Sequence, residues 1–289
     1  MELKYNYSLA KKLFIIPVVI FVIAIFFLVQ NYMQTGSFLK KGLDFQGGVQ
    51  ISLPQKERID TESFVSFLSS QLGTKEIDVS TTVNPTTRQQ ERVIVSVSGL
   101  KDQEKLVNAV SEFLKKELKP TDYSISVIAP ALAGTFWREA QTAFIVAFIL
   151  MMIVVGFAYR AVAPSVAILV STVYDLVAIL GFMVFFDIKL SLATFAALLM
   201  VIGYGVDTNI ILTEKILKEK EGDVFDRVGK AMRTGLTMSA ATIVSLVALF
   251  FFAESLVIKQ IAIALLMGAL ADIPNTWILN ALLLLRFRK

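Results

Sequence analysis

The chain has 289 residues, 55% of them hydrophobic, and a mean hydropathy of +0.67, which is typical of a membrane protein and not of an ordinary soluble domain. It has no cysteine and no histidine, which excludes disulfides, Cys/His metal sites and His-based catalytic triads; we expect neither a metal nor a cofactor. The net charge of +4 does not indicate nucleic-acid binding, because region 36–140 holds 13 basic and 13 acidic residues.

Six stretches are long and apolar enough to cross a membrane, which takes about 20 helical residues. They are residues 13–33, 138–159, 164–186, 190–213, 235–256 and 260–285. Lysines precede the first stretch, as in a signal peptide, but no small-residue cleavage site follows it. We therefore expect this stretch to be a retained anchor.

Lysine and arginine predict the orientation, because they collect in short loops on the cytoplasmic side. Thirteen of them lie at the two termini, at Arg160 and in segment 214–233, whereas the opposite short loops hold only Lys189 and Lys259. We expect a multi-pass protein of the cell membrane with both termini in the cytoplasm and residues 36–137 outside. The mixed charges of the cytoplasmic loop 214–233 indicate a solvated helical connector.

Segment 36–137 alternates strand-like and helix-like patterns. The expected elements are strands at 49–53, 77–83, 92–97 and 123–128, helices at 61–72 and 106–118, and a turn at Asn84, Pro85 and Thr86. This βαββαβ order is typical of a ferredoxin-like domain. The predicted fold class is an all-α six-helix membrane bundle with an α+β ferredoxin-like extracytoplasmic domain inserted between spans 1 and 2. The expected domains are 1–35 (tail and span 1), 36–137 (extracytoplasmic domain) and 138–289 (spans 2–6).

Three carboxylates lie well inside the expected spans: Asp175 in the third, Asp207 in the fourth and Asp272 in the sixth. Each costs roughly 2.5–3.5 kcal/mol at the centre of a membrane helix, so each is a candidate functional group. No Lys or Arg lies deep in a span to neutralise them, which suits groups that gain and lose protons. The simpler interpretation is polar contact between helices, but three acids in one bundle favour a function.

Polar and small residues accompany these acids. Gly203 lies four residues before Asp207, which leaves room on that helix face for a neighbouring helix or for water. Asp272 begins a polar stripe at helical spacing, and Pro274 is expected to loosen the backbone beside it, although an ordinary kink fits equally well. The supporting set is Gly203, Thr208, Asn209, Asn275, Thr276 and Asn280.

Two motifs resemble one protein family. Segment 42–48, GLDFQGG, is similar to the Gly-x-Asp-Phe-x-Gly-Gly signature of the SecD/SecF protein-export family. Segment 202–218, IGYGVDTNIILTEKILK, resembles the fourth span of that family, and segment 271–277, ADIPNTW, is closer to its archaeal form. The resemblance covers essentially the full length. The family is itself similar in architecture to the resistance-nodulation-division superfamily, in which membrane acids couple proton flow to movement of external domains.

The resemblance implies an auxiliary subunit of the Sec translocase, not an enzyme, that couples proton flow to polypeptide export. It implies Asp207 as the proton-coupling acid, whereas Asp175 and Asp272 are candidates from burial alone. It also implies a junction between the external domain and the membrane, formed by Gly42, Asp44, Phe45, Gly47 and Gly48. The implied partners are a SecD-like six-span subunit, the Sec translocon, the translocating polypeptide, membrane lipid and protons.

An intramembrane aspartyl protease is the main alternative. Tyr174-Asp175 and the segment 203–207, GYGVD, are similar to the Tyr-Asp and Gly-x-Gly-Asp motifs of presenilin-like enzymes, and Pro130 begins a Pro-Ala-Leu run like their third motif. Two carboxylates sharing a proton would suit that chemistry. Against it, Val206 interrupts the second motif, and the Pro-Ala-Leu run precedes both acids and lies outside the spans. A small-molecule exporter of the same superfamily and a passive scaffold are further alternatives.

Overall fold

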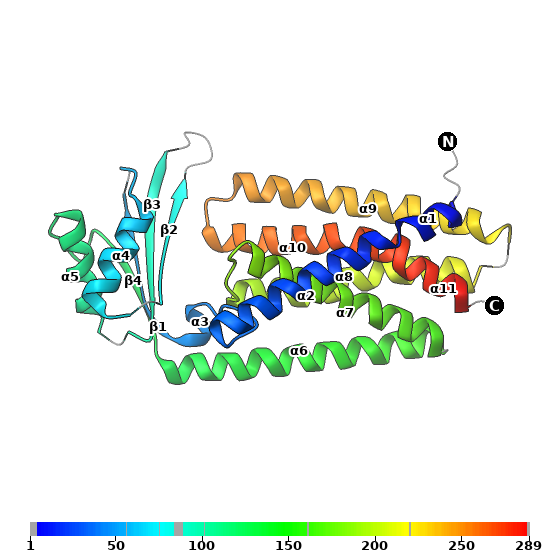
Figure 1. Ribbon diagram of the computed structural model, residues 1–289, viewed down its shortest axis with the longest axis horizontal. Coiled ribbons are helices and arrows are strands. Elements are labelled where there is room, and N and C mark those ends of the chain that lie inside the picture. The colour runs from blue at the N-terminus through cyan, green and yellow to red at the C-terminus, as the bar shows by residue number, and fades with distance from the viewer. Residues whose placement is uncertain are drawn as a thin grey trace.

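The computed structural model describes residues 5–55, 57–74, 76–83, 89–100, 102–160, 162–219 and 221–287. Long helices form an elongated bundle, and a small domain of strands and helices lies at one end of it (Figure 1). The first helix, α1 (Tyr7–Leu13), and the last, α11 (Ala281–Phe287), both lie at the other end of the bundle. The chain therefore folds as a helical body with one folded domain outside it.

Six helical segments among the described residues are long and apolar enough to cross a membrane. They are formed by α1 with α2 (Ile15–Thr35), α6 (Pro130–Tyr159), α7 (Val162–Phe185), α8 (Leu192–Leu217), α9 (Val224–Phe252), and α10 (Leu256–Pro274) continued by the π-helix η1 (Asn275–Asn280) and α11. The six expected spans are confirmed. α6 begins at Pro130, in the first helical turn where proline is favoured, so the expected domain boundary at 137/138 falls inside this helix.

The prediction of a solvated connector over 214–233 is wrong for its second half. α9 begins at Val224, and its first turns pack into the bundle: Arg227 is only 2% exposed. Val228 and Ala231 belong to the same apolar cluster as Leu212 of α8. Val228 and Ala231 are three residues apart and therefore lie on one face of the helix. Burial of this apolar face packs the segment into the bundle despite the charged residues in it.

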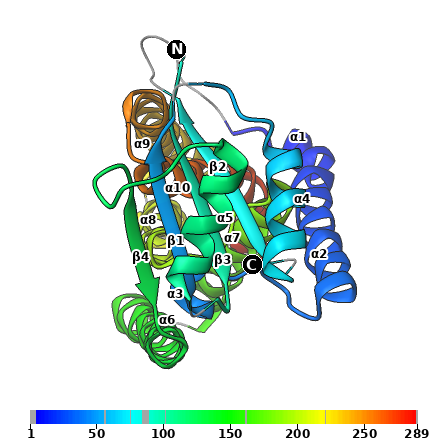
Figure 2. The ribbon, with the colours of Figure 1, turned by 90° about the vertical axis from the view of Figure 1, so that its left-hand side faces the viewer.

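α7, α8 and α10 form the centre of the bundle, and α2, α6 and α9 lie around them (Figure 2). Glycines allow close approach at these contacts. A Cβ added to Gly181 of α7 would overlap Ala24 of α2, and one added to Gly268 of α10 would lie 2.9 Å from Val201 of α8. Small residues at helix contacts are the usual way in which membrane helices gain packing energy.

The extramembrane domain lies between α2 and α6 in the chain. Its elements are α3 (Leu43–Gln46), β1 (Gly48–Pro54), α4 (Thr61–Leu72), β2 (Ile77–Val83), β3 (Gln90–Ser98), α5 (Gln103–Leu114) and β4 (Ser124–Ile128). The strands form one antiparallel sheet in the order β2-β3-β1-β4, in which Ile51 is paired with Val95 on one side and Ile125 on the other. The expected turn at residues 84–86 lies outside the described residues.

Helices α4 and α5 cover one face of this sheet and bury its core (Figure 2). The buried side chains alternate along the strands, as a half-buried sheet requires. Asp60 and Asp102 cap the two helices by accepting backbone N–H bonds. The Ser63 hydroxyl, which donates to Asp60, is the main cause that lowers the pKa of that carboxyl.

Candidate functional site

Eight polar side chains meet in the centre of the bundle, each at most 2% exposed. We call this set the acid cluster; its members are Ser171 and Asp175 on α7, Thr208 and Asn209 on α8, Asp272 on α10, and Asn275, Thr276 and Asn280 on η1. Groups of this kind are costly in a membrane interior unless they bind one another. Two of the three predicted acids, Asp175 and Asp272, therefore lie together in one hydrogen-bonded site.

Asp272 receives hydrogen bonds from two helices. The Thr208 hydroxyl of α8 lies 3.0 Å from its Oδ2 atom, and the Thr276 hydroxyl, one turn further along, lies 2.7 Å from its Oδ1 atom. Each hydroxyl has a single proton, and each has a second acceptor nearby, Gly205 O for Thr208 and Asn209 Oδ1 for Thr276. The hydroxyl protons can therefore turn toward or away from this carboxyl.

Asp175 has one partnered and one unpartnered oxygen. Asn275 Nδ2 donates to its Oδ1 atom at 2.8 Å, and the same amide lies 2.8 Å from the hydroxyl and the carbonyl oxygen of Ser171. The Oδ2 atom faces α8 at Gly205, where an added Cβ would lie 3.2 Å from it. The absence of a side chain at Gly205 leaves space for this carboxyl.

Asn209 joins the two halves of the acid cluster. Its Oδ1 atom accepts hydrogen bonds from Ser171 at 3.0 Å, from Thr276 at 3.2 Å and from the Asn280 amide. Its own amide donates to the Gly205 carbonyl at 2.6 Å. One side chain of α8 therefore holds α7 and η1 in register.

The acid cluster has more acceptors than donors. Asp175 Oδ2, Asn275 Oδ1 and Asn280 Oδ1 are buried and have no donor among the described residues. No Lys or Arg in the described part of the chain forms an ion pair with either carboxyl. A proton bound to either carboxylate would supply a donor, so the arrangement suits reversible protonation.

The backbone beside Asp272 is loosened, as Pro274 predicts. α10 ends at this proline, and the next six residues form a π-helix. Such segments are rare and are frequently found at functional sites. Here the wider turn brings Asn275, Thr276 and Asn280 to the interior together.

Asp207 lies outside the acid cluster. It is exposed on the surface of α8, together with Gly203, around which an added Cβ would meet nothing. Thr208 and Asn209 follow it directly in sequence, but each residue turns the helix by about 100°, which carries them to the buried side. Sequence alone placed Asp207 in a span correctly, without fixing which way it points.

The Gly-rich segment 42–48 forms the joint between the extramembrane domain and the helices. Gly42 N–H donates to Leu190 O at 2.7 Å, and Leu190 N–H donates to Lys40 O at 2.8 Å. Asp44 Oδ2 accepts from the Leu192 N–H, the first of α8, at 2.9 Å. The first N–H groups of a helix have no partner within it, and a carboxylate there also meets the positive end of the helix dipole. Asp44 therefore caps the helix that carries Thr208 and Asn209.

Phe45 and the two following glycines complete this joint. The Phe45 ring is buried against Trp137 of α6 and Phe195 of α8, with centroid separations of 5.4 and 6.2 Å. Gly47 and Gly48 adopt φ angles of 76° and 142°, a region that favours glycine. A Cβ on Gly47 would also lie 2.9 Å from Pro130, at the start of α6. The motif residues thus fix the domain to both α6 and α8.

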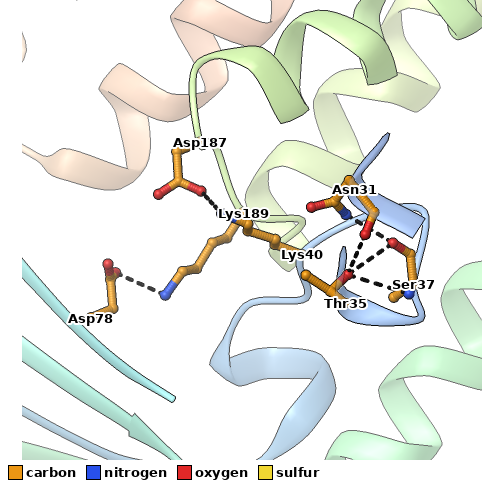
Figure 3. Close-up of polar contacts among 7 residues, drawn as sticks. All are labelled: Asn31, Thr35, Ser37, Lys40, Asp78, Asp187 and Lys189. Carbon is orange, nitrogen blue, oxygen red and sulfur yellow. Dashed lines mark hydrogen bonds and ion pairs between the residues drawn. The ribbon is translucent and has the colours of Figure 1, made fainter. Parts of the chain in front are cut away.

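Two ion pairs span the other side of this joint (Figure 3). Lys189, in the loop between α7 and α8, lies 3.3 Å from Asp78 of the edge strand β2, and Lys40 lies 2.5 Å from Asp187 of the same loop. They border a polar cavity of about 590 Å³. Sequence patterns gave no signal for these pairs, because their partners are far apart in the chain. Ser171 and Gly205 were also missed, although Ser171 precedes Asp175 by one helical turn and could have been found from that spacing.

These observations define a class: a multi-pass membrane protein with buried carboxylates and one folded domain outside its helices. A family model described as protein export membrane protein SecD/SecF, C-terminal, matches residues 109–289. The chain belongs to this SecD/SecF family. Among the described residues no group of three or more Asp or Glu side chains is placed to hold a metal ion.

Relatives and solved structures agree with this family. Proteins named protein-export membrane protein SecF are similar over most of their length: 38% identical in Pyrococcus furiosus, covering 94% of this chain and 88% of that one, and 34% in Methanothermobacter thermautotrophicus, covering 93% and 90%. These names describe export proteins and not enzymes. The crystal structure of SecDF, a translocon-associated membrane protein from Thermus thermophilus, has the same fold, with a TM-score of 0.76 at 20% identity. The match covers 99% of this chain and 39% of that longer chain.

Gly48→Ala tests the joint. The added Cβ would meet Val97 O and Ser98 at a φ of 142°, so we expect a loss of stability of at least about 1–3 kcal/mol, measured as a lower melting temperature of the full chain in detergent. Gly134→Ala, at a helical position with open space around it, is the matched control and should leave the melting temperature unchanged or slightly raised. Equal effects of the two substitutions would contradict this role of Gly48.

Asn209→Ala tests the centre of the acid cluster. It removes the acceptor shared by three donors, and at the roughly 0.6 kcal/mol typical of a hydrogen bond between membrane helices we expect a loss of about 2 kcal/mol. Thermal unfolding of the full chain in detergent measures it. The control is Thr213→Val, because the buried Thr213 hydroxyl bonds only to a carbonyl of its own helix. A melting temperature as high as that of the control would show that Asn209 does not join the helices.

Proposed function

We propose that the chain is the SecF-type subunit of a protein-export complex and couples proton flow across the membrane to the export of polypeptides. One observation carries this proposal: the helix that provides Thr208 and Asn209 to the acid cluster is capped by Asp44 of the extramembrane joint. A proton-binding site and a movable external domain need such a connection if one is to drive the other. The names of the relatives, which describe protein export, supply the process.

Protonation is the expected chemical event at the acid cluster. A neutral carboxyl donates one hydrogen bond where a carboxylate only accepts. A proton on Asp175 would therefore change its contacts with α8 at Gly205, and a proton on Asp272 would compete with the Thr208 and Thr276 hydroxyls. The cluster joins three helices, so the protonated and the deprotonated forms, which make different hydrogen bonds, favour different relative positions of these helices.

α8 is the expected transmitter of this change. It runs without a break from Leu192, at the joint, past Thr208 and Asn209 to Leu217. A rigid helix that shifts or turns at its middle moves its ends as well. Its first turn holds the extramembrane domain through Asp44 and Phe45, so we infer that movement of α8 moves this domain.

The orientation follows from the charges and from the placement of the termini. α1 and α11 lie at the end of the bundle away from the sheet (Figure 1), which agrees with the basic residues near both termini. We infer that the termini are cytoplasmic and that residues 36–137 form an extracytoplasmic domain, with 1–35 and 138–289 as the membrane parts. The β-α-β-β-α-β order and the antiparallel sheet support a ferredoxin-like assignment of that domain.

The exposed side of α8 is the expected contact with a SecD-like six-span partner. α8 lies between α6 and α9 on one side of the bundle (Figure 2), and its outward residues at intervals of three and four include Met200, Gly203 and Asp207. The neighbouring α9 exposes small and hydroxyl residues, namely Thr234, Thr237, Ala241, Ser245 and Ala248. Small and polar residues are typical of helix contacts, whereas an acid facing lipid is costly. We propose that Asp207 meets a polar group of this partner and exchanges protons there.

The remaining partners follow from the same proposal. The Sec translocon and the translocating polypeptide would meet the extracytoplasmic side, and lipid surrounds the helices. The protease alternative is not favoured, because Asp175 is buried and Asp207 is exposed on another helix face; the two acids of the protease-like motifs do not share a site.

Asp175→Asn tests proton coupling by the acid cluster. The substitution keeps the shape of the side chain, but an amide does not bind and release a proton at physiological pH. We therefore expect most of the stimulation of secretion by a proton gradient to be lost, measured in vesicles that contain the chain and the SecD-like partner. Glu254→Gln, which changes an exposed acid of the loop between α9 and α10, is the control. Normal stimulation in Asp175→Asn, with an unchanged melting temperature and partner co-purification, would contradict the role of Asp175.

Asp207→Asn tests the acid on the outer face of α8. We expect it to abolish stimulation by the proton gradient while assembly with the SecD-like partner survives, because an amide keeps the polar contact and loses the proton. Secretion in vesicles and co-purification are the two measurements. Glu214→Gln, on the same helix near its cytoplasmic end, is the matched control. If stimulation persists in Asp207→Asn, Asp207 is not a coupling group.

A further inference from the structure

A second surface of the bundle differs from the α8–α9 side. α2 and α6 are the least buried of the six spans, and together with α7 they border an apolar cavity of about 400 Å³. Phe21 of α2, Phe148 and Met152 of α6, and Val173 of α7 line it. Its size is within the range of about 300–1,000 Å³ in which ligand sites of proteins fall.

Hydrocarbon is the chemistry that this cavity accepts. Tyr174 brings a polar atom to its lining, and that hydroxyl already donates to the Pro17 carbonyl at 3.0 Å, while its ring stacks on Phe21 at 5.5 Å. A ligand would find no hydrogen-bonding group free to bind it. Val173 is nevertheless 44% exposed, so the cavity is open toward the surrounding membrane.

The walls fit a lipid better than a helix of another protein. The outward residues of α2 and α6 are bulky, for example Ile23, Phe26, Ile149 and Ile153, whereas helix contacts in membranes use small residues that let backbones approach. The exposed side of α9 is mixed, because Thr, Ala and Ser residues lie there beside bulky ones such as Val244 and Leu249. The bulky residues beside the cavity therefore favour lipid as its neighbour.

Basic residues flank the end of the cavity nearer the termini. Lys11 and Lys12 precede its Pro17 wall by about one to two helical turns, and Arg160 follows its Met152 wall by about two turns. All three are exposed, and none has an acidic partner in the part of the chain that the structure describes. Such side chains attract anionic headgroups at a membrane surface.

We propose that this cavity is a binding site for one hydrocarbon tail of an anionic lipid from the leaflet on the side of the chain termini, with its headgroup at Lys11 and Lys12. The tail contacts Tyr174 and Leu279, which are next in sequence to Asp175 and Asn280 of the acid cluster. A bound tail therefore stabilises the helix packing directly behind that cluster.

Native mass spectrometry of the full chain, after incubation with equimolar phosphatidylglycerol and phosphatidylcholine in detergent, tests this site. We expect one phosphatidylglycerol retained per chain, and Val173→Trp, which fills the cavity, to lower the retained fraction at least fivefold. Val244→Trp, at a 68% exposed position of α9, is the matched control and should retain the lipid. The double substitution Lys11→Gln, Lys12→Gln should keep a bound lipid but remove the preference for phosphatidylglycerol at least threefold.

Several outcomes would overturn the proposal. These are no retained lipid in the unchanged chain, the same retention in the two tryptophan variants, or crosslinking of a photoreactive residue at position 173 to a protein in native membranes. The two tryptophan variants are compared only if their melting temperatures equal that of the unchanged chain. If Val173→Trp unfolds, Val170→Trp, which fills the same cavity from α7, decides the test by the same fivefold criterion.

Discussion

Polar groups in the hydrocarbon interior must find their partners within the protein, because no water is available there to bind them. Asp175 and Asp272 meet this constraint in part, through hydroxyl and amide donors of α8 and η1, while Asp175 Oδ2 has no donor among the described residues. The helix order of the bundle follows from it. α7, α8 and α10 occupy the centre because they carry these groups, and Gly205 and Gly268 let them approach closely. The helices that contribute no side chain to the acid cluster, α2, α6 and α9, lie outside.

A different requirement acts at the joint to the extramembrane domain, which is built on the start of α8. A helix that begins at the membrane surface leaves its first N–H groups without partners. Asp44 satisfies one of them, and the Ser191 hydroxyl satisfies another through the Thr194 N–H. The cap therefore serves the helix and the domain together. With Phe45 held by aromatic rings of α6 and α8, the domain cannot shift at this point without disturbing the start of the helix.

Sequence predicts most elements well and the directions of side chains poorly; among the elements, the helix expected at 106–118 runs from Gln103 to Leu114 and ends where Lys115 adopts a left-handed conformation. Hydropathy located the six spans, and alternation located the strands within one or two residues, because both depend on local periodicity. The stripe from Asp272 to Asn280 was recognised by its spacing. Sequence groups Asp207 with the buried acids, because its position within a span does not determine whether its side chain faces the interior of the bundle or its surface. The pairing of Asp44 with Leu192, 148 positions away, lies beyond any local pattern.

The two sides of the domain are held with unequal strength. At the joint, backbone hydrogen bonds, a buried ring and glycines at positive φ act together. At the edge strand β2, the tie is the ion pair between Asp78 and Lys189, whose side chains are 43% and 31% exposed. An ion pair so exposed contributes only about 0–1 kcal/mol, less than the change that a proton can produce in a buried carboxyl site. If α8 shifts as proposed, the ion pair at β2 would break before the joint is disturbed, and the domain would rotate about segment 42–48.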